Sequence, residues 1–417
     1  MGAAFRAYLR RLVRRGRLQV ETADGVIETF GDGLGPLLGV KLVDRAAELR
    51  LMLNPALALG ELYMDGRLVV TKGGLYDLLE LGARNLAELE RQPWAKALNR
   101  ARKAFRGLQR RNNRRRSKRN VASHYDLDQR LYSLFLDSDL QYSCAYFEYP
   151  GQSLDDAQTA KKRHIASKLL TKDGATTLDI GCGFGGLGLY LAGVAGARVT
   201  GVTLSEEQFA VATSRARQMG LADRVDFRLQ DYRDVGETFD RIVSVGMFEH
   251  VGASRYDEFF TKVRTLLKDD GVMLLHSIGR NSVPGVTNPW IRKYIFPGGY
   301  IPSLSEVLPA IERAGLYVTD VEILRLHYAE TLRVWRERFM AHRDEAAKLY
   351  DERFCRMWEF YLAGSETSFR VDGHMVMQLQ LAKRQEPVPL TRDYILEREA
   401  ELRRREAAQS VIRHAAE

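Results

Sequence analysis

Four glycines within six residues are the feature of this sequence best suited to bind a ligand. Gly181, Gly183, Gly185 and Gly186 belong to the segment TLDIGCGFGG (177–186), which follows an apolar run and precedes the apolar stretch 187–192. Glycine tolerates positive φ and has no side chain, so this turn lets backbone amides approach a nucleoside or nucleotide closely. A structural turn without a ligand is the alternative explanation.

The residues that follow do not match a dinucleotide site. Such a site expects an acidic residue at the end of the second strand, about 20 residues after the glycines. Residues 198–202 form the expected second strand, and Thr203 rather than an acid follows it. The expected third strand, 225–229, is followed by Gln230 and Asp231, a polar pair that suits an adenine ring.

Two further strand ends carry side chains capable of chemistry. The expected strand 241–245 is followed by Glu249, and the expected strand 272–275 is followed by His276. Strands and helices alternate at regular spacing through this region, which predicts an α/β fold with a parallel sheet and helices on both faces. The ligand site is then expected at the carboxyl ends of the strands.

Length and composition limit the class of protein. A chain of 417 residues with 45% apolar content can bury a large core and suggests two domains. Its three cysteines, Cys144, Cys182 and Cys355, have no metal-ligand spacing and are too few for a disulfide framework, which favours a reducing cytoplasm. No run reaches the 18 or so apolar residues of a membrane-spanning helix, so a soluble or peripheral protein is expected.

The net charge of +9 is concentrated in one segment, because residues 96–119 contain twelve Lys or Arg residues and no acid. A solvated helix face explains such a run about as well as binding to nucleic acid or an acidic membrane surface. Basic segments that also carry an apolar helical stripe favour a lipid surface. Apolar residues at that spacing occur here and in the arginine-rich amino terminus: Phe105, Leu108, Phe5, Leu9 and Leu12.

The two ends of the chain carry no catalytic cluster. Residues 1–90 predict a small mixed α/β region with apolar helices at 55–63 and 75–89. Simple packing against the catalytic region and direct lipid contact are equally good explanations of this region. The alternating charges of residues 392–417 predict a solvated helix or a subunit contact.

Several short blocks, taken in order, resemble the cyclopropane-fatty-acyl-phospholipid synthases and the mycolic acid cyclopropane synthases, which are S-adenosylmethionine-dependent methyltransferases. The resemblance covers residues 120–385 and extends more loosely to residues 59–66. The matching blocks are VASHYDL (121–127), QYSCAYF (141–147), LDIGCG (178–183), GVTLSEEQ (201–208), MFEHVG (247–252), HSIG (276–279), KYIFP (293–297) and HYAETL (327–332).

The resemblance implies an architecture, a location and partners. It implies a class I methyltransferase sheet of the Rossmann-like type at 121–390, an amino-terminal lipid-engaging domain at 1–90, a basic linker at 91–120 and a charged helix at 391–417. The expected enzyme acts on unsaturated, anionic phospholipid at the inner face of the cell membrane. It is expected to be cytoplasmic and peripheral, to form a homodimer and not to bind nucleic acid.

The implied reaction joins a methyl group from a sulfonium to an alkene and then removes a proton from that methyl group. Water would capture the intervening cation, so an apolar, dry site is required. In the resembled enzymes the base is a bound bicarbonate ion, and aromatic side chains such as Tyr142, Tyr146 or Phe147 can stabilise the cation. The catalytic residues carried over by position are Cys144, Glu249, His276, Ile278 and Tyr328.

The resemblance also predicts the residues that bind S-adenosylmethionine, with the methionine end near the first of them and the adenosine near the last. They are Tyr142, Ser143, Asp179, Gly181, Cys182, Gly183, Thr203, Leu204, Gln208, Gln230 and Asp231. Asp179 is expected to fix the turn or to meet the amino-acid group through water. No residue set has metal-ligand grouping, so no protein-bound metal is expected.

One departure from the family pattern bears on the mechanism. Ser365 stands where many relatives carry a cysteine, so a thiol at that position takes no part, and Cys355 is interpreted as structural. The alternatives are a fatty-acyl methyltransferase that makes methyl- or methylene-branched chains, a nucleic-acid or small-molecule methyltransferase, and a non-enzymatic lipid-binding protein. A base methyltransferase expects Asn-Pro-Pro-Tyr after the fourth strand, where this chain has residues 246–249, GMFE.

Overall fold

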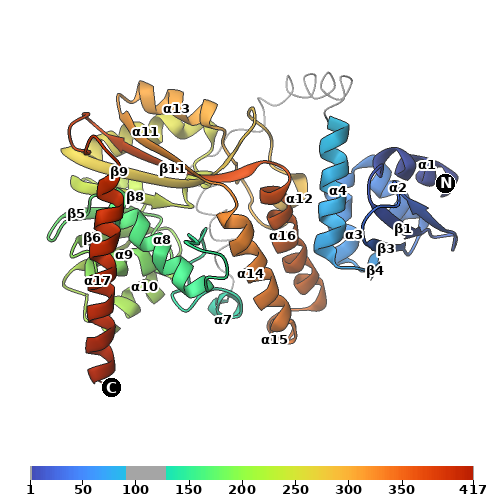
Figure 1. Ribbon diagram of the computed structural model, residues 1–417, viewed down its shortest axis with the longest axis horizontal. Coiled ribbons are helices and arrows are strands. Elements are labelled where there is room, and N and C mark those ends of the chain that lie inside the picture. Colours follow the sequence, from blue (N-terminus) through green and yellow to red (C-terminus); the bar gives the residue numbers. More distant parts are fainter. Residues whose placement is uncertain (1, 91–127, 417) are drawn as a thin grey trace. The chain divides into compact units, whose positions relative to one another are not determined.

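The computed structural model describes residues 2–90 and 128–416 of the chain (Figure 1). The predicted linker 91–120, its basic run 96–119 and the block 121–127 lie outside the described residues. The described chain forms two compact units. The first contains residues 2–90, 286–297 and 332–374, and the second contains residues 128–285, 298–331 and 375–416.

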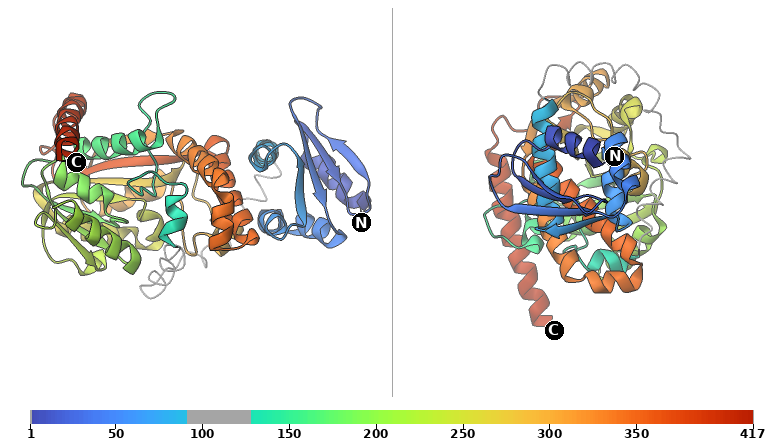
Figure 2. Two further views of the ribbon diagram at one scale, coloured as in Figure 1. Left: turned by 90° about the horizontal axis from the view of Figure 1, so that it is seen from below. Right: turned by 90° about the vertical axis from the view of Figure 1, so that its right-hand side faces the viewer.

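The first unit is built on a mixed four-stranded sheet of order β2-β1-β3-β4, whose strands are the dark blue arrows in Figure 2. β1 pairs with β2 antiparallel and with β3 parallel. The small mixed α/β amino-terminal fold is therefore confirmed. The elements are α1 (Gly2–Leu12), β1 (Arg17–Glu21), β2 (Ile27–Phe30), β3 (Leu37–Leu42), α2 (Arg45–Leu53), α3 (Pro55–Met64), β4 (Leu68–Lys72) and α4 (Leu75–Glu90).

Later segments complete the first unit. They are α12 (Pro289–Tyr294), most of α14 (His327–Ala341), α15 (Arg343–Leu349) and α16 (Glu352–Arg370). Trp290 of α12 donates its indole N–H to Met64 Sδ of α3 at 3.3 Å, and Lys293 Nζ lies 2.6 Å from Glu61 Oε1. The block 293–297, predicted to belong to the catalytic region 121–390, thus packs with the amino-terminal residues.

The apolar stripe at the amino terminus does not face lipid, so that interpretation of the sequence is wrong. Phe5 is 1% exposed and Leu9 is 7% exposed, and both belong to the core of the first unit with Leu18 and Val20 of β1. Leu12 packs against the same core. The sheet has an apolar face that must be covered. A helix with an apolar stripe of this period can cover a sheet or lie on a membrane, and its sequence is the same in both cases.

The second unit contains a seven-stranded sheet of order β10-β11-β9-β8-β5-β6-β7. β5, β6, β7, β8 and β9 pair in parallel, and β10 pairs with β11 antiparallel. The expected Rossmann-like sheet is confirmed. The strands are β5 (Thr176–Ile180), β6 (Arg198–Thr203), β7 (Val225–Leu229), β8 (Phe239–Val245), β9 (Leu267–Arg280), β10 (Tyr317–Leu324) and β11 (His374–Ala382).

Helices cover both faces of this sheet (Figure 1). On one face Phe259, Val263 and Ile311 form a core with the strands, and on the other Ile165 and Leu189 form a second core. The first face is covered by α11 (Tyr256–Leu266) and α13 (Leu304–Arg313), and the second by α8 (Leu154–Lys168), α9 (Gly186–Gly193) and α10 (Glu206–Gln218). The short α7 (Gln129–Ser133) and the 3-10 turns Tyr232–Asp234, Phe248–His250 and Ala253–Arg255 complete the unit.

The carboxyl-terminal helix α17 (Asp393–Ala416) is not simply solvated, which corrects one of its two sequence interpretations. Ile395 and Leu402 are buried, and Leu402 belongs to the core that contains Ile165 of α8. Glu399 Oε1 lies 2.7 Å from His164 Nδ1 of α8. The alternating charges of this helix therefore made its buried apolar residues and its buried ion pair difficult to recognise in the sequence. No helix in the described part of the chain is long and apolar enough to cross a membrane.

Candidate active site

The glycine turn between β5 and α9 has the backbone geometry that its composition predicts. Gly181, Gly183 and Gly185 have φ of +84°, +54° and +84°, values that side-chain-bearing residues rarely adopt. The amides of Gly181 and Cys182 both donate to Val202 O of β6, at 2.9 and 3.1 Å. The turn is thereby held at the carboxyl end of the sheet.

One pocket lies at these strand ends, and it brings the whole predicted cofactor set together. Its wall comes from the turn after β5, the ends of β6, β7 and β8, and the segment 140–143. The predicted residues that line it are Tyr142, Ser143, Asp179, Gly181, Cys182, Gly183, Thr203, Leu204, Gln208, Gln230 and Asp231. Residues at the ends of β5, β6 and β7 thus converge because parallel strands end at the same edge, and the segment 140–143 lies beside them.

The two sides of this pocket differ in how many of their polar atoms are already bonded. Asp231 accepts hydrogen bonds from Arg233 Nε and Nη2 at 2.9 and 2.6 Å, so its carboxylate is held by its own segment. Thr203 Oγ1 donates to Gln208 Oε1 at 3.1 Å. These bonds shape the wall near β6 and β7.

Asp179, at the other side, keeps an unpaired oxygen. It is 2% exposed, and its Oδ2 has no hydrogen-bond partner among the described residues. Burial raises the pKa of its carboxyl to about 7, with the positive charge of Lys161 opposing that shift. A buried acceptor without a partner is costly unless a ligand supplies the donor, so Asp179 fits a pocket that binds a cationic or N–H-bearing group.

Lys161 of α8 also lines the pocket, although no sequence motif singled it out. Its Nζ donates to Gln141 Oε1 at 2.6 Å and to Ser143 Oγ at 2.7 Å. The sequence shows only that Lys161 belongs to a helix. Which face of that helix is buried, and hence that Lys161 reaches the pocket, is known only from the packing of the helix.

Among the predicted catalytic residues, Glu249 and Ile278 are in direct contact. The amide of Ile278, in β9, donates to Glu249 Oε1 at 2.6 Å. Glu249 is 7% exposed, and its other oxygen, Oε2, has no partner among the described residues. Burial raises the pKa of Glu249 to about 7, with the Ile278 amide opposing that shift.

His276 lies two residues before Ile278 on β9, and its carbonyl accepts from the amide of Gly246 at 2.9 Å. Its ring is buried, which lowers its pKa to about 3 and keeps it neutral. Gln378 Nε2 lies 3.2 Å from His276 Nδ1. With the amide as donor, Nδ1 accepts, and the ring proton is on Nε2, where it can be donated to a ligand.

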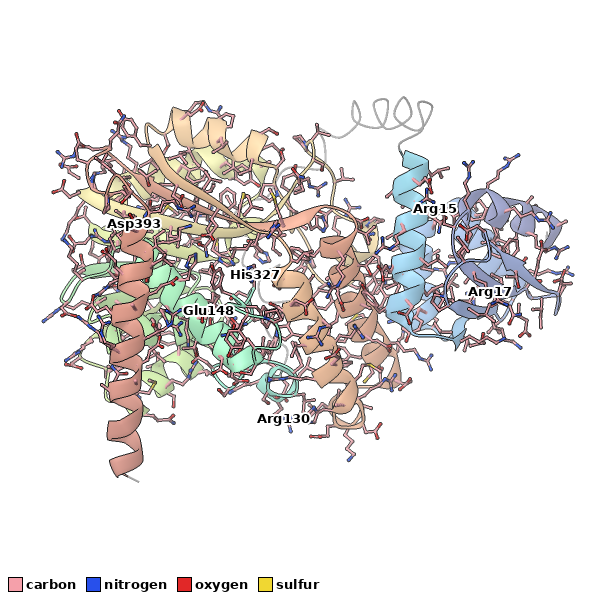
Figure 3. The ribbon with its side chains drawn as sticks, in the orientation of Figure 1. Arg15, Arg17, Arg130, Glu148, His327 and Asp393 are labelled. Atoms are coloured by element: carbon pink, nitrogen blue, oxygen red, sulfur yellow. The ribbon has the colours of Figure 1, made fainter. Side chains whose placement is uncertain are left out.

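Cys144 and Tyr328 belong to two segments that are hydrogen-bonded to each other. The amide of Ala145 donates to Thr331 Oγ1 at 3.0 Å, and the amide of Phe147 donates to Nδ1 of His327, labelled in Figure 3, at 3.0 Å. Tyr328 is half-buried in the first turn of α14. The Cys144 thiol is buried, which raises its pKa and keeps it protonated.

The predicted catalytic residues therefore form two local groups beside the pocket. Glu249, His276 and Ile278 lie at the ends of β8 and β9, and Cys144 lies with the segment that bears Tyr328. Met247 and His250, on either side of Glu249, line the pocket, as does Ser143 next to Cys144. Within the described residues no group of three or more His, Cys, Asp or Glu side chains is arranged to hold a metal ion.

Comparison with known proteins agrees with this geometry. The model of the mycolic acid cyclopropane synthetase family matches residues 112–379. The cyclopropane-fatty-acyl-phospholipid synthase of Escherichia coli (strain K12) is 43% identical over 260 residues, covering 62% of this chain and 66% of that protein. The tuberculostearic acid methyltransferase of Mycobacterium tuberculosis (strain ATCC 25618 / H37Rv) is 36% identical over 396 residues, 89% of this chain and 90% of that protein.

A solved structure shows the same fold. A mycolic acid cyclopropane synthase, crystallised with S-adenosylhomocysteine and CTAB, superposes with a TM-score of 0.60 at 35% identity, covering 63% of this chain and 97% of that one. The glycine turn and the pocket described above lie within residues 112–379, which the family model matches. The chain belongs to the mycolic acid cyclopropane synthetase family and is an S-adenosylmethionine-dependent methyltransferase.

Proposed function

We propose that this enzyme adds a methylene unit from S-adenosylmethionine across the cis double bond of unsaturated phospholipid acyl chains, with a bound bicarbonate ion as the base. The observation that carries the proposal is Glu249, a buried carboxyl with one unpaired oxygen that lies between residues lining the cofactor pocket. An acid in that position can hold a proton-bearing anion next to a methyl donor.

The residues of the pocket fit S-adenosylmethionine. The unpaired Oδ2 of Asp179 suits the ammonium of the methionine end. Gly181 and Gly183 leave the floor of the pocket to backbone atoms, so a ligand can approach the turn closely. Thr203, Gln208 and the residues after β7 remain for the ribose and adenine. When bound, S-adenosylmethionine supplies an electrophilic methyl group.

The chain's own groups suit the capture of a proton by a small oxyanion. Glu249 Oε2 can accept the hydroxyl of bicarbonate, while Ile278 holds Oε1 and so fixes the carboxyl plane. Ile278, one of the residues carried over as catalytic, thus acts through Glu249, because its amide donates to that carboxyl. His276 can donate from Nε2, and Tyr328 can donate its hydroxyl.

Burial of these groups supports a reaction that passes through a carbocation on the acyl chain. Glu249, His276 and Cys144 are all nearly inaccessible to water. Water would convert the cation to an alcohol, so a dry site is a requirement of ring formation. Aromatic side chains at the site, among them Tyr142, can favour the cationic transition state.

A membrane surface is the proposed place of the reaction, since the substrate is a phospholipid. The basic run 96–119 has the charge to associate with anionic lipid from the cytoplasmic side. We include a homodimer in the proposal, with the exposed side of α17 available for a subunit contact. Binding to nucleic acid is not part of it.

A second candidate is transfer that ends in a methyl- or methylene-branched chain. The observation in its favour is that the tuberculostearic acid methyltransferase matches 89% of this chain and 90% of its own length. Both reactions begin with the same methyl transfer. They differ in which proton is then removed.

Product analysis tests both candidates. Purified protein is incubated with labelled S-adenosylmethionine and vesicles of unsaturated, anionic phospholipid, with and without bicarbonate. The proposal expects acyl chains one CH2 heavier, with the cyclopropane proton signals in NMR spectra and a dependence on bicarbonate. A product that carries the added carbon but keeps olefinic protons supports the second candidate, and unmodified lipid overturns both.

A further inference from the structure

Lys161 is a buried cation that the proposed mechanism does not use. It lies on α8, is 1% exposed and lines the cofactor pocket. Its Nζ donates to two neutral acceptors, Gln141 Oε1 at 2.6 Å and Ser143 Oγ at 2.7 Å. An ammonium group has three donors, so these two bonds leave one N–H available.

The other buried lysines of α8 have carboxylate partners, and Lys161 does not. Lys162 pairs with Asp139, and Lys168 Nζ lies 2.8 Å from Asp320. Within the described part of the chain Lys161 forms no ion pair. Burial of an ammonium without a counterion is costly, and here desolvation lowers the pKa of Lys161 to about 8.

Two acids that attract Lys161, Asp137 and Asp139, are hydrogen-bonded to other groups. Asp137 accepts from the amide of Gln141 at 2.9 Å, and Asp139 bonds to Lys162, Arg215 and Gln141. They attract the ammonium from a distance without forming a salt bridge to it. The positive charge of Lys161 is therefore available to an anion in the pocket.

The same pocket contains an acid with an unpaired atom. Asp179 Oδ2 is buried and has no partner among the described residues. Burial raises the pKa of Asp179 and the charge of Lys161 opposes that shift from a distance, but no salt bridge joins the two groups in the described structure. A pocket with one cation and one acid that are not bonded to each other matches a ligand group that bears both an ammonium and a carboxylate. The α-amino-acid end of a methionine derivative is such a group.

We propose that Lys161 makes the pocket selective for the carboxylate of the methionine end, acting directly or through the Ser143 hydroxyl that it orients, while Asp179 recognises the ammonium. The inference rests on the proposed binding of S-adenosylmethionine in this pocket. It adds a specificity residue outside the glycine turn and the strand ends. Adenosyl ligands that lack the carboxylate are then discriminated against.

A purely structural role for Lys161 makes a different prediction. If Lys161 only holds the segment with Gln141 and Ser143 in place, its loss lowers the affinity for every adenosyl ligand by the same factor. If it recognises the carboxylate, its loss weakens only ligands that carry one. The ratio of two affinities therefore separates the two roles, and it does so without catalysis.

The experiment is calorimetric titration of the purified full-length protein with S-adenosylhomocysteine and with its decarboxylated analogue. Wild-type protein is expected to bind S-adenosylhomocysteine about ten- to a hundredfold more tightly, as for a hydrogen-bonded charge pair. In Lys161→Met and Lys161→Gln the ratio is expected to fall to about one, and in Lys161→Arg to persist.

Two control variants keep the carboxylate subsite intact. Lys168→Met removes another buried, charged lysine from the same helix, where it pairs with Asp320 and Glu322 outside the pocket, and should keep the wild-type ratio. Asp179→Asn should lower the affinities for S-adenosylhomocysteine and for its decarboxylated analogue by the same factor, because both ligands carry the ammonium.

Equal affinity of the wild-type protein for the two ligands overturns the inference, even if no Lys161 variant folds. So does a Lys161→Met protein that keeps the wild-type ratio. Failure of the wild-type protein to bind S-adenosylhomocysteine at all removes the inference together with the cofactor assignment, which is a distinguishable outcome.

Discussion

At the scale of single residues, the proposed chemistry depends on two carboxyl groups that are buried away from water. Glu249 and Asp179 are both buried, and burial raises the pKa of each to about 7. Each has one oxygen without a partner in the described structure. A buried acid without a hydrogen-bond partner lowers the free energy of unfolding. Such acids are typical of sites where a ligand completes their hydrogen bonds.

Replacement of Glu249 by glutamine tests its proposed role. Glu249→Gln keeps the size and the bond from Ile278 but cannot take up negative charge, so turnover should fall about 10²- to 10⁴-fold, as for loss of a general acid–base group. Binding of S-adenosylhomocysteine should remain, because Glu249 is not among the residues lining that pocket.

The control for this variant is Glu312→Gln, which changes an exposed glutamate of α13 and should leave turnover at the wild-type level. Rates are measured as incorporation of label into phospholipid. A Glu249→Gln enzyme with wild-type turnover, or one that no longer binds S-adenosylhomocysteine, would contradict the assignment.

At the scale of elements, the turn between β5 and α9 is the most constrained part of the site. A Cβ on Gly185 would lie 2.7 Å from Phe227 Cζ and 2.8 Å from Ala212 Cβ, and its φ is +84°. Gly185→Ala should therefore lower the free energy of unfolding by about 2–4 kcal/mol, from left-handed backbone strain together with overpacking.

Gly220 separates these two causes. It also has positive φ, +65°, but nothing lies within 4 Å of the position of its Cβ. Gly220→Ala should cost only the backbone part, about 1–2 kcal/mol. Both are measured by urea denaturation, and equal losses in the two variants would show that packing around Gly185 is unimportant.

A second element-scale feature is the attachment of α17 and β10 to α8 through His164. Its Nδ1 lies 2.7 Å from Glu399 Oε1 of α17, and its Nε2 lies 2.8 Å from Glu322 Oε2 of β10. Two carboxylate partners favour the imidazolium and raise the pKa of His164 despite burial and the nearby Lys168. The ring also stacks on Tyr146 at 4.4 Å between centroids.

This arrangement predicts a pH-dependent contribution to stability. Because the folded pKa is raised above the unfolded value of about 6.5, the contribution is complete below that pH and is lost as pH rises through the folded value. His164→Gln should lower the free energy of unfolding by about 3 kcal/mol near pH 6, since the buried Glu399 carboxylate loses its close partner while Glu322 keeps Lys168, and by less at higher pH.

The matched control is His342→Gln, at an exposed histidine that follows α14. It should show little effect at any pH. Urea denaturation at several pH values between 6 and 9 gives the comparison. A loss in His164→Gln that does not change with pH would mean that the ring is not charged in the folded protein.

At the scale of the whole molecule, the two units are not consecutive in sequence. The chain leaves the second unit after Gly285, contributes α12 to the first unit and returns at Gly298. Shortly after the return, the amide of Tyr300 donates to the carbonyl of Glu249 at 2.9 Å. The segment 286–297, which belongs to the first unit, is therefore followed closely in the chain by Tyr300, whose amide holds the backbone of the proposed catalytic acid.

Close packing between α3 and α12 makes this assembly sensitive to a single methyl group. A Cβ on Gly60 of α3 would lie 2.4 Å from Trp290 Nε1. Gly60→Ala should lower the stability of the first unit by about 1–3 kcal/mol through overpacking. Hydrogen exchange at the amides of α3 measures this locally.

Gly82 of α4 provides the comparison within the same unit, because nothing lies within 4 Å of its Cβ position. Gly82→Ala should stabilise by about 0.5–1 kcal/mol, as expected for glycine in an exposed helix. If Gly60→Ala also stabilises, the contact between α3 and Trp290 is not tight in solution.

Local patterns in the sequence were sufficient to predict much of the fold and of the site. The glycine run from Gly181 marked the turn because positive φ is a property of the residue itself. The polar residues after the strands marked the pocket, since strand ends can be located from apolar periodicity and parallel strands end at one edge. The full set of eleven cofactor residues came from the family resemblance, and all eleven line that pocket.

Contacts between distant segments were decided only by the tertiary structure. The sequence could not show that Lys161 reaches Ser143 without a carboxylate partner, that the Ile278 amide is given to Glu249, or that Phe5 and Leu402 are core residues. An amphipathic helix has the same sequence whether it covers a sheet or meets a membrane, and a charge is paired or unpaired only in relation to what packs against it. Periodicity reports the face of an element, whereas the partner of that face depends on the packing of the whole chain.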